Sequence, residues 1–422
     1  MTYKNQSLKH WIVLVLACGL IGGSFGIGIN AAGVFYTPVS ESLGVLRGSF
    51  ALSTTLYLIS MSIVSLIVPR ALRRYRYKHI LMVSVSVSGL ATFLLGSATN
   101  MMMFHLLSII RGMGHAFFAM VPMTMLVNAW FKKHHGVATA LVLGFSGIAG
   151  VIFSPLFTSI IGSMGWQMAY RASAILSIAL SLPAILVPFR LNPKDEGLLP
   201  YGAMEADMAS LVNVKMASSF NLKQLSFVLF LVFAVMLTMI TGVPQHFPGF
   251  AQSLDFSAAV GATMLSAAMF GNIFFKLFFG FLSDRFGVIK TMLFIMTLNA
   301  ISMVLLLSIP NPVVFTLGAF LFGSCYSMGA VGVSILTKDF FGLENYGKTF
   351  PVISLLAGMG GASAITLVGF VYDFTGSYNY AFIFSLGFIV IGLILLVLII
   401  HLLKRKSKNS ISIPMHVHPS NS

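Results

Sequence analysis

Lys276 interrupts an apolar run, MFGNIFFKLFFGFLSDRFGVIK at 269–290, that otherwise has the composition of a membrane-spanning helix. A charge near the centre of a bilayer costs at least ~2.5–3.5 kcal/mol, so this lysine is expected to face a cavity rather than lipid. Asn272 and Gly280, each four residues away, would share its helix face. An ammonium group there could hold a negatively charged ligand. The alternative is a lysine that reaches the membrane surface, since Asp284 is only eight residues further on.

Arg111 is the second charge inside an apolar run, and it lies one turn before His115, so both would share one helix face. Arg111 could line the same cavity or donate hydrogen bonds to backbone carbonyls. His246 lies in PQHFP, where prolines would break a helix, and could belong to a loop or to a gate. If protons move together with a ligand, His115 and His246 are the side chains best suited to carry them.

Three further side chains are candidates for the cavity. Asn30 could bind a ligand or hydrogen-bond a neighbouring helix, and Phe322 and Tyr326, four residues apart, could wall a cavity or only pack. All ten Asp and Glu residues fall in connections or at helix ends, so the predicted membrane interior carries only positive charge. Such an interior attracts an anion and repels a cation.

The composition is that of an integral membrane protein, since 57% of the 422 residues are hydrophobic and 8% are charged, with a mean hydropathy of +0.94. A soluble protein carries about 25% charged residues. Cys18 and Cys325 fall inside apolar runs and are interpreted as core residues rather than as a disulfide. The sequence shows no catalytic triad, metal-binding cluster or nucleotide-binding loop, so we expect no enzyme activity and no cofactor.

Twelve apolar runs are long enough to cross a hydrocarbon core of ~30 Å. They lie at 11–36, 48–69, 80–99, 102–130, 137–161, 172–189, 225–247, 257–282, 291–309, 312–336, 350–371 and 379–403. The connections alternate in charge, and 21 of the 25 Lys and Arg residues lie on one side, in 1–10, 70–79, 131–136, 190–224, 283–290, 337–349 and 404–422. By the positive-inside rule, both termini are predicted to be cytoplasmic. The net charge of +15 therefore reflects topology rather than a nucleic-acid partner.

The two halves of the chain repeat with an offset of 211 residues. The offset carries Arg74 onto Arg285, Gly112 onto Gly323, Gly136 onto Gly347, Gly147 onto Gly358, Gly150 onto Gly361 and Gly165 onto Gly376. Two equal six-helix halves are the plan of a secondary transporter whose substrate site lies near mid-membrane between them. We therefore predict an all-α membrane protein with twelve transmembrane helices in two pseudo-symmetric halves, 1–189 and 225–403, joined by a linker at 190–224 and followed by a basic tail at 404–422.

The repeat separates packing residues from functional ones. Glycines on the fifth and eleventh helices are predicted to let neighbouring helices approach closely. They are Gly144, Gly147, Gly150, Gly358 and Gly361. Lys276 and Arg111 have no charged counterpart, since the offset places them opposite Ser65 and Phe322. Both charges are additions to a symmetric frame, as functional residues would be.

Gly280-x3-Asp284-Arg285-x-Gly287 closes the run that contains Lys276. This pattern resembles the signature of the loop between helices 8 and 9 in the major facilitator superfamily, which controls conformational change. The first-half copy at 69–75 lacks the acidic residue. More narrowly, the chain is similar to the bacterial oxalate/formate antiporter and monocarboxylate transporter group in GVFYTPVSESLGVLRGSFALS (33–53), NAWFKKHHGVA (128–138), FSGIAGVIFSP (145–155), NPKDEGLLPYG (192–202) and TGSYNYAF (375–382).

The resemblance implies which residues would bind a substrate. In that group a cation on helix 8 holds the substrate carboxylate, and Lys276 stands at that position. Asn272 stands where the monocarboxylate branch often has an acidic residue, and Asn30 where related carriers have a lysine. Oxalate exchangers also carry a lysine on helix 11, whereas 350–371 carries no charge here. The resemblance therefore implies a monocarboxylate-like anion rather than oxalate.

The leading hypothesis is a secondary transporter that moves a small organic anion across the cytoplasmic membrane by alternating access, either by anion exchange or together with protons. It would act as a monomer in the lipid bilayer. A drug or sugar transporter of the same fold is the alternative, and a membrane sensor without flux is a third. A carboxylate in the cavity would favour cationic drugs, and a sensor would be expected to carry an output domain.

Overall fold

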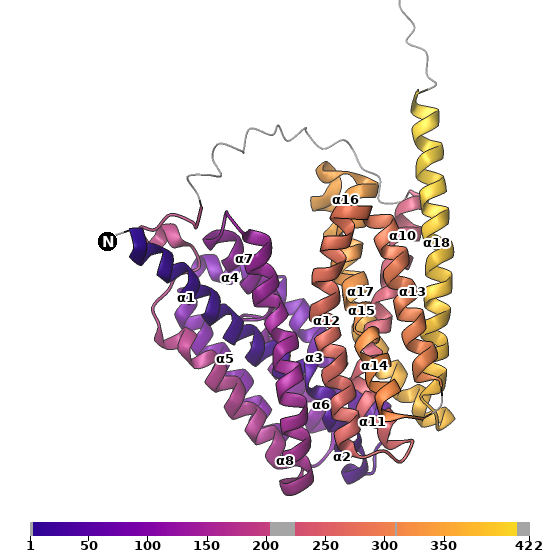
Figure 1. The fold of residues 1–422 in the computed structure, drawn as a ribbon. Helices are drawn as coiled ribbons and strands as arrows, with labels where there is room; N and C mark the ends of the chain where they lie inside the picture. The colour runs from indigo at the N-terminus through magenta and orange to yellow at the C-terminus, as the bar shows by residue number, and fades with distance from the viewer. Residues whose placement is uncertain (1–2, 203–223, 309, 412–422) are drawn as a thin grey trace, which may run out of the picture.

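The computed structural model describes residues 3–202, 224–308 and 310–411, and these are almost entirely helical. The helices form two bundles side by side, coloured indigo to magenta and orange to yellow in Figure 1. The first bundle contains α1 (Tyr3–Ile21), η1 (Gly22–Asn30), η2 (Ala32–Phe35), α2 (Tyr36–Leu43), α3 (Arg47–Ser65), α4 (Val68–Arg74), α5 (Tyr77–Leu95), α6 (Met101–His115), α7 (Met120–Trp130) and α8 (His135–Leu186). The second contains α10 (Leu225–Met239), η4 (Ile240–His246), α11 (Phe247–Gln252), α12 (Ala258–Phe286), α13 (Val288–Leu306), α14 (Pro312–Phe322), α15 (Ser324–Ser327), η5 (Met328–Gly332), α16 (Val333–Phe341), α17 (Leu343–Thr375) and α18 (Asn379–Ile411).

Helix α8 supplies two membrane crossings. It has 52 residues, about twice the ~20 that span a bilayer core. Gly165, with φ 83° and ψ 164°, interrupts it, and this φ is one that a residue with a side chain rarely adopts. Eleven segments of the described chain are long and apolar enough to span a membrane. The turn at Gly165 divides one of them in two, which gives the predicted twelve crossings.

Equivalent glycines make equivalent helix crossings in the two bundles. A Cβ on Gly112 of α6 would clash with the backbone of Tyr57 on α3, and a Cβ on Gly323 would clash with the backbone of Ala268 on α12. The 211-residue offset carries each residue of the first pair onto its counterpart in the second. The repeat seen in the sequence is therefore also present in the helix packing.

Four of the expected spans are not continuous α-helices, and their breaks fall at positions that the repeat relates. η1 and η2 interrupt the first span, and η4 interrupts the seventh. A break at 116–119 separates α6 from α7, and α15 with η5 occupies the equivalent place in the tenth span. Pro244 lacks the backbone N–H that an α-helix requires, which accounts for the break in η4.

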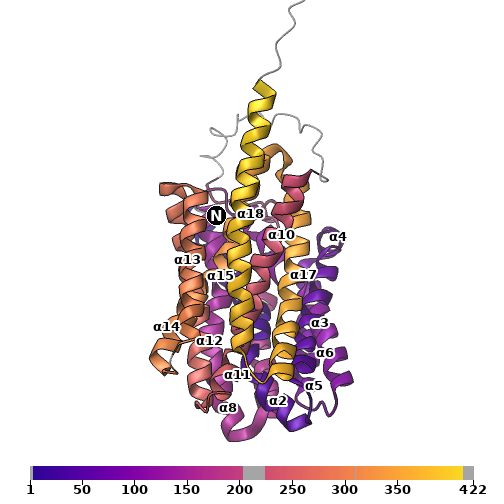
Figure 2. The ribbon, with the colours of Figure 1, turned by 90° about the vertical axis from the view of Figure 1, so that its right-hand side faces the viewer.

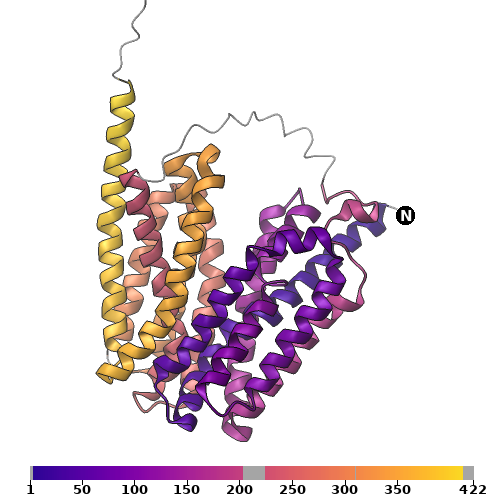
Figure 3. The ribbon, with the colours of Figure 1, turned by 180° about the vertical axis from the view of Figure 1, so that it is seen from behind.

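The two bundles meet at one end and diverge towards the other (Figures 1 and 3). We call these the closed end, which carries α2, α11 and the turn at Gly165, and the linker end, which carries η3 (Pro193–Glu196) and the start of α10. Two helix pairs join the bundles. Thr55 Oγ1 of α3 donates to Ala362 O of α17 at 2.6 Å. Ser266 Oγ of α12 donates to Val151 O of α8 at 3.1 Å.

The segment 190–202 lies against the first bundle. The backbone N–H of Tyr201 donates to Trp130 O at 2.8 Å, and the Trp130 indole N–H donates to Arg190 O at 3.0 Å. The remainder of the predicted linker, 203–223, and the last residues of the predicted tail, 412–422, lie outside the described residues. Figure 2 shows α18 extending beyond the other helices of its bundle, and it continues past the predicted span end at 403 to Ile411.

Candidate functional site

Lys276 lies on α12, one turn past the helix midpoint towards the linker end. Its side chain is half-buried, and Asn272, one turn earlier, is buried with its amide oxygen unpaired. In the described part of the chain no ion pair reaches the ammonium group. Its helix packs against α15, which carries Cys325. A cation in a membrane-spanning helix without a carboxylate partner lacks most of the compensation that its burial requires.

Close packing brings α12, which carries Lys276, against α14 and α15. A Cβ on Gly271 of α12 would clash with the carbonyl oxygen of Phe320 on α14. A Cβ on Gly323 would reach the backbone N of Asn272 at 2.6 Å. Two glycines therefore allow α12 to cross α14 and α15 with backbones almost in contact, as small residues do in membrane helices.

Tyr326, the residue after Cys325, adds a hydroxyl group to this region. It is hydrogen-bonded to the side chain of Gln245 on η4. The Gln245 amide oxygen has no partner, so the amide N–H is the donor. A tyrosine hydroxyl that accepts in this way keeps its own hydrogen for another acceptor. Lys276 and Tyr326 therefore offer an ammonium and a hydroxyl donor from neighbouring helices of one bundle.

His246 lies at the contact between the bundles. Its ring centroid is 5.1 Å from that of Tyr36 on α2, and Nε2 is 2.8 Å from the carbonyl oxygen of Ile365 on α17. A carbonyl only accepts, so Nε2 carries the hydrogen and Nδ1, which has no partner, is the basic nitrogen. Next to it, a Cβ on Gly33 of η2 would clash with the carbonyl of Gln245. This pair of contacts brings η2 and α2 against η4.

Arg111 lies in the interior of the first bundle, on α6, where only 7% of it is exposed. The guanidinium carbon is 4.5 Å from the centroid of the Tyr57 ring, and Nη2 donates to Gly28 O at 3.4 Å. Nε has no hydrogen-bond partner. It lines a cavity that residues of the first bundle enclose. The two intramembrane charges lie in different bundles, as the predicted halves require, and the cavity at Arg111 is lined by residues of the first bundle.

His115 and Asn30 also point into the first bundle. His115 Nδ1 lies 2.6 Å from the Tyr57 hydroxyl oxygen, and its ring packs against Phe118. The Asn30 amide donates to Ser146 O at 2.9 Å, which joins η1 to α8. Of the two roles considered for Asn30, a hydrogen bond between helices is present in this conformation.

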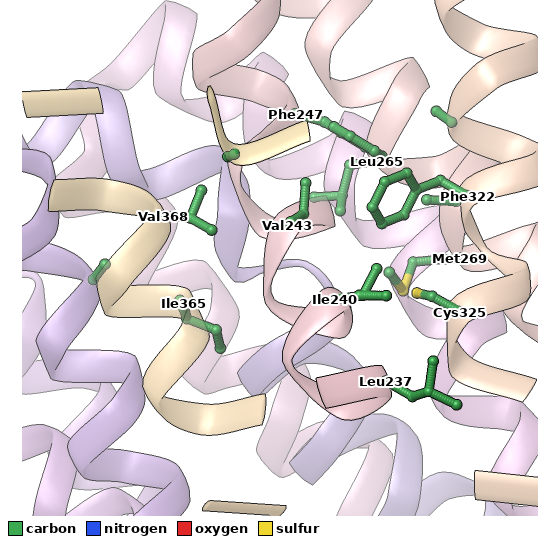
Figure 4. Close-up of a cluster of buried hydrophobic side chains, with 14 of the residues drawn as sticks. Leu237, Ile240, Val243, Phe247, Leu265, Met269, Phe322, Cys325, Ile365 and Val368 are labelled. Carbon is green, nitrogen blue, oxygen red and sulfur yellow. The ribbon is translucent and has the colours of Figure 1, made fainter. Parts of the chain in front are cut away.

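Phe322 lies in apolar packing, which Figure 4 shows together with Leu265, Met269 and Phe247. The side chain is fully buried, and its ring centroid lies 5.4 Å from that of Phe247. The Phe322 carbonyl oxygen accepts a hydrogen bond from Asn299 Nδ2 at 3.2 Å. Packing, the second of its two proposed roles, accounts for every contact described here.

The candidate conformational motif lies at the linker end. Asp284 and Arg285 are exposed, and in the described residues Asp284 takes part in no ion pair. Gly287, with φ 84°, turns the chain from α12 into α13. A Cβ on Gly280 would meet no atom within 4 Å. The motif is therefore not engaged with the first bundle in this conformation.

The five glycines predicted to serve helix packing differ in their surroundings. A Cβ on Gly147 would lie 2.6 Å from a side-chain atom of α12, and a Cβ on Gly150 would lie 2.8 Å from another. A Cβ on Gly361 would lie 3.0 Å from a side-chain atom of α10. The nearest atom to a Cβ on Gly144 would be at 4.0 Å, and Gly358 has none within 4 Å.

Tyr36, Gln245 and Asp373 take part in the contacts between the bundles, and the sequence reasoning did not select them. Gln245 precedes His246 in a proline-flanked segment that had already been selected, and that position was a usable signal. Asp373 precedes Gly376 at the end of an apolar run, but its partners lie on α3 of the other bundle and leave no local pattern in the sequence.

The sequence model of the Major Facilitator Superfamily matches residues 18–263 and 246–419. The chain belongs to the Major Facilitator Superfamily. The two overlapping matches cover most of the chain: the first runs from within α1 through α11, and the second from the end of η4 past α18. The fold predicted from the sequence, an all-α membrane protein with two six-helix halves, is confirmed.

Superfamily transporters of known sequence and structure resemble most of the chain. It is 26% identical to YhjX, an uncharacterised MFS-type transporter of Escherichia coli (strain K12), over 369 residues that cover 85% of this chain and 88% of that protein. It is 26% identical to NarT, a probable nitrate transporter of Staphylococcus epidermidis, over 323 residues that cover 75% and 77%. The crystal structure of the nucleoside transporter NupG matches with a TM-score of 0.70 at 12% identity, over 94% of this chain and 99% of that one. The likeness to NupG extends to the fold alone, and the relatives indicate a secondary transporter.

Proposed function

We propose that this secondary transporter carries a small, monocarboxylate-like organic anion and that Lys276 binds its carboxylate. The observation that carries the proposal is an ammonium group within a membrane-spanning helix that has no ion pair among the described residues. A monoanionic substrate would supply the missing negative charge. The resemblance to the oxalate/formate antiporter and monocarboxylate transporter group supports the same role for this position.

The groups around Lys276 suit a carboxylate. Tyr326 has a hydroxyl hydrogen available, because its oxygen accepts from Gln245. Hydrogen bonds to an ionised carboxylate are about twice as strong as those between neutral groups. The unpaired amide oxygens of Asn272 and Gln245 could accept a hydrogen bond from a hydroxyl group elsewhere on the substrate.

A cationic substrate fits the same surroundings poorly. Acidic residues of the described helices lie near helix ends and not at mid-membrane. Glu41, Asp284 and Asp373 are examples. A cation would therefore meet Lys276 without a carboxylate to offset the repulsion. NarT is named as a probable transporter of nitrate, which is also an anion, and this adds support.

We further propose that the linker end is cytoplasmic, since 21 of the 25 Lys and Arg residues fall in segments predicted to lie on that side. The arrangement in Figure 1 would then be inward-facing. Transport would require the halves 1–189 and 225–403 to rock about the site so that the closed end opens. We assign the protein to the cytoplasmic membrane, as a monomer with both termini in the cytoplasm.

Coupling could be anion exchange or movement together with protons. Exchange requires only that the loaded site face each side in turn. For proton-linked transport, His246 offers an unpaired ring nitrogen at the contact between the bundles. His115 also has an unpaired ring nitrogen, Nε2, but its ring is buried inside the first bundle, where Nδ1 is hydrogen-bonded to Tyr57. Its position away from the contact between the bundles makes it the less suitable of the two predicted proton carriers.

Uptake into proteoliposomes tests the proposal. The purified full-length protein would be assayed for uptake and counterflow of formate, acetate, lactate, pyruvate and dicarboxylates, with and without a pH gradient. A sugar, a nucleoside and a cationic drug serve as comparison substrates. We expect saturable counterflow of at least one monocarboxylate. Transport of a neutral or cationic compound alone would contradict the proposal in favour of a drug or sugar transporter.

A further inference from the structure

A small polar cavity lies in the first bundle, between η1, α3, α6 and α8, and Arg111 forms part of its wall. Its other polar lining residues carry hydroxyl groups. They are Tyr36, Ser53, Thr54, Ser108, Tyr170 and Ser173. The cavity volume is about 10 Å³, which is roughly what one water molecule requires, and a monatomic ion is of similar size. An organic carboxylate does not fit in this conformation.

The guanidinium group at this cavity is a permanent charge, because arginine is not deprotonated in proteins. It is more than nine-tenths buried, and its described partners are the neutral carbonyl of Gly28 and the face of the Tyr57 ring. No carboxylate among the described residues pairs with it. Neither contact supplies a negative charge, so the structure leaves the charge of Arg111 without a counter-ion.

Two unpaired polar atoms belong to residues of the cavity wall. Arg111 Nε and Ser53 Oγ are both buried and have no hydrogen-bond partner. Next to Ser53, Thr54 Oγ1 accepts from the Tyr36 hydroxyl at 2.9 Å, so its own hydrogen is available to another acceptor. The wall therefore presents one cationic donor and two hydroxyl donors, which suits an anion.

We propose that this Arg111 pocket binds one monatomic anion, a halide of the size of chloride. The pocket is too small for the organic substrate in this conformation. The buried charge of Arg111 and the unpaired donors favour an anion over a neutral water molecule. The ion would join η1, α3 and α6 within the first bundle. This site is separate from Lys276, which belongs to the second bundle, and it does not depend on the identity of the transported anion.

Anomalous diffraction tests the site directly. Crystals of the full-length protein grown in sodium bromide should show an anomalous peak within hydrogen-bond reach of Arg111 Nε and Ser53 Oγ. An ordered water without anomalous signal at that place would overturn the proposal. So would bromide bound beside Lys276 alone.

Thermal unfolding in detergent provides a second test that requires no crystal. We expect the Tm of the protein to rise with chloride concentration relative to gluconate, because a ligand that binds only the folded state stabilises it. Ser53→Ala should weaken the apparent chloride affinity severalfold, and Arg111→Gln should abolish the chloride effect. Lys276→Gln is the matched control, since it removes a membrane-embedded cation from the other site and should retain the full chloride effect.

The variants also separate this proposal from the transport proposal. A chloride response unchanged in Ser53→Ala, or absent from the unmodified protein, would overturn the Arg111 pocket whatever Lys276 binds. If Arg111→Gln does not fold, the Ser53→Ala response and the bromide position still decide. If Lys276→Gln loses the chloride response while Ser53→Ala keeps it, the halide binds beside Lys276 and the proposal for the Arg111 pocket is wrong.

Discussion

Asp373 caps the first turn of α3 at Gly48, across the contact between the two bundles. Its carboxylate accepts from the backbone N–H of Gly48 at 2.7 Å and from that of Arg47 at 3.0 Å. The first N–H groups of a helix have no partner within the helix, and a negative charge at this end is favourable. The Arg47 guanidinium carbon lies 4.3 Å from the Tyr372 ring centroid. The end of α17 is thus fastened to the start of α3 at the closed end.

Replacing Asp373 with alanine should loosen the closed end. A hydrogen bond to a charged group is worth about 1.5–3 kcal/mol, so the equilibrium should shift at least about tenfold away from this conformation. Spin labels at the exposed closed-end positions Met164 and Val313 should then report a longer distance population. Glu41→Gln is the control, because Glu41 reaches Arg47 only at 3.4 Å from an exposed position and such pairs contribute little. Equal distance distributions in both variants would argue against the cap.

Asp284 lies at the linker end, near the C-terminal end of α12, as Asp373 lies near the C-terminal end of α17 at the closed end. It is exposed and forms no ion pair in the described chain, as expected if it engages the first bundle only when the linker end closes. Asp284→Asn should therefore lower the maximal transport rate for all substrates alike, because closure is slowed rather than recognition. A change in substrate preference at an unchanged maximal rate would contradict this role.

His246 and His115 should respond differently to replacement by glutamine. His246→Gln should weaken proton-linked uptake and leave anion counterflow in place, because His246 has a free basic nitrogen at the contact between the bundles. His115→Gln is the comparison, and its effect on proton-linked uptake should be smaller. Counterflow and pH-gradient-driven uptake would be measured on the same vesicles. Loss of counterflow in a well-folded His246→Gln protein would show that this ring is needed for binding or for the cycle itself.

Glycine substitutions test the packing between α12 and its neighbours. Gly323→Ala should destabilise the protein, since its Cβ would clash with the Ala268 carbonyl and overpacking costs about 1–3 kcal/mol. Gly358→Ala should leave the Tm close to that of the unmodified protein, because no atom lies within 4 Å of its Cβ. The comparison would be made by thermal unfolding in the same detergent. An equal Tm for both variants would show that α12 and α14 do not approach this closely.

The fold was largely predictable because its determinants are local. Apolar run length predicts the number of crossings, and glycines at a fixed offset predict the repeat. The break at η4 falls where the prolines around His246 were expected to interrupt a helix. The breaks at η1 and η5 were not predicted, because an apolar run reports burial in the membrane and not helix continuity. The division of α8 at Gly165 agrees with the predicted separation of the fifth and sixth spans.

The candidate site was predictable only in part. Lys276 was found because a charge in an apolar run is visible in one dimension. The half that contains Arg111 was also predicted, but its position in the interior of that bundle was not, since a helix face does not reveal which helices pack against it. The Asp373 cap was also missed, because its partners are backbone N–H groups more than 300 residues away, which leave no pattern in the sequence.

The central claim is that Lys276 is the counter-ion of the substrate, and monocarboxylate counterflow by Lys276 variants tests it most directly. We expect Lys276→Ala to lose substrate binding by about tenfold or more, the cost of losing a charge-assisted hydrogen bond, and to lose counterflow while it remains monodisperse in detergent. Lys276→Arg should retain part of the activity, and Lys78→Ala, which removes an exposed lysine outside the candidate site, should be unaffected. Near-normal counterflow by a well-folded Lys276→Ala protein would contradict the account.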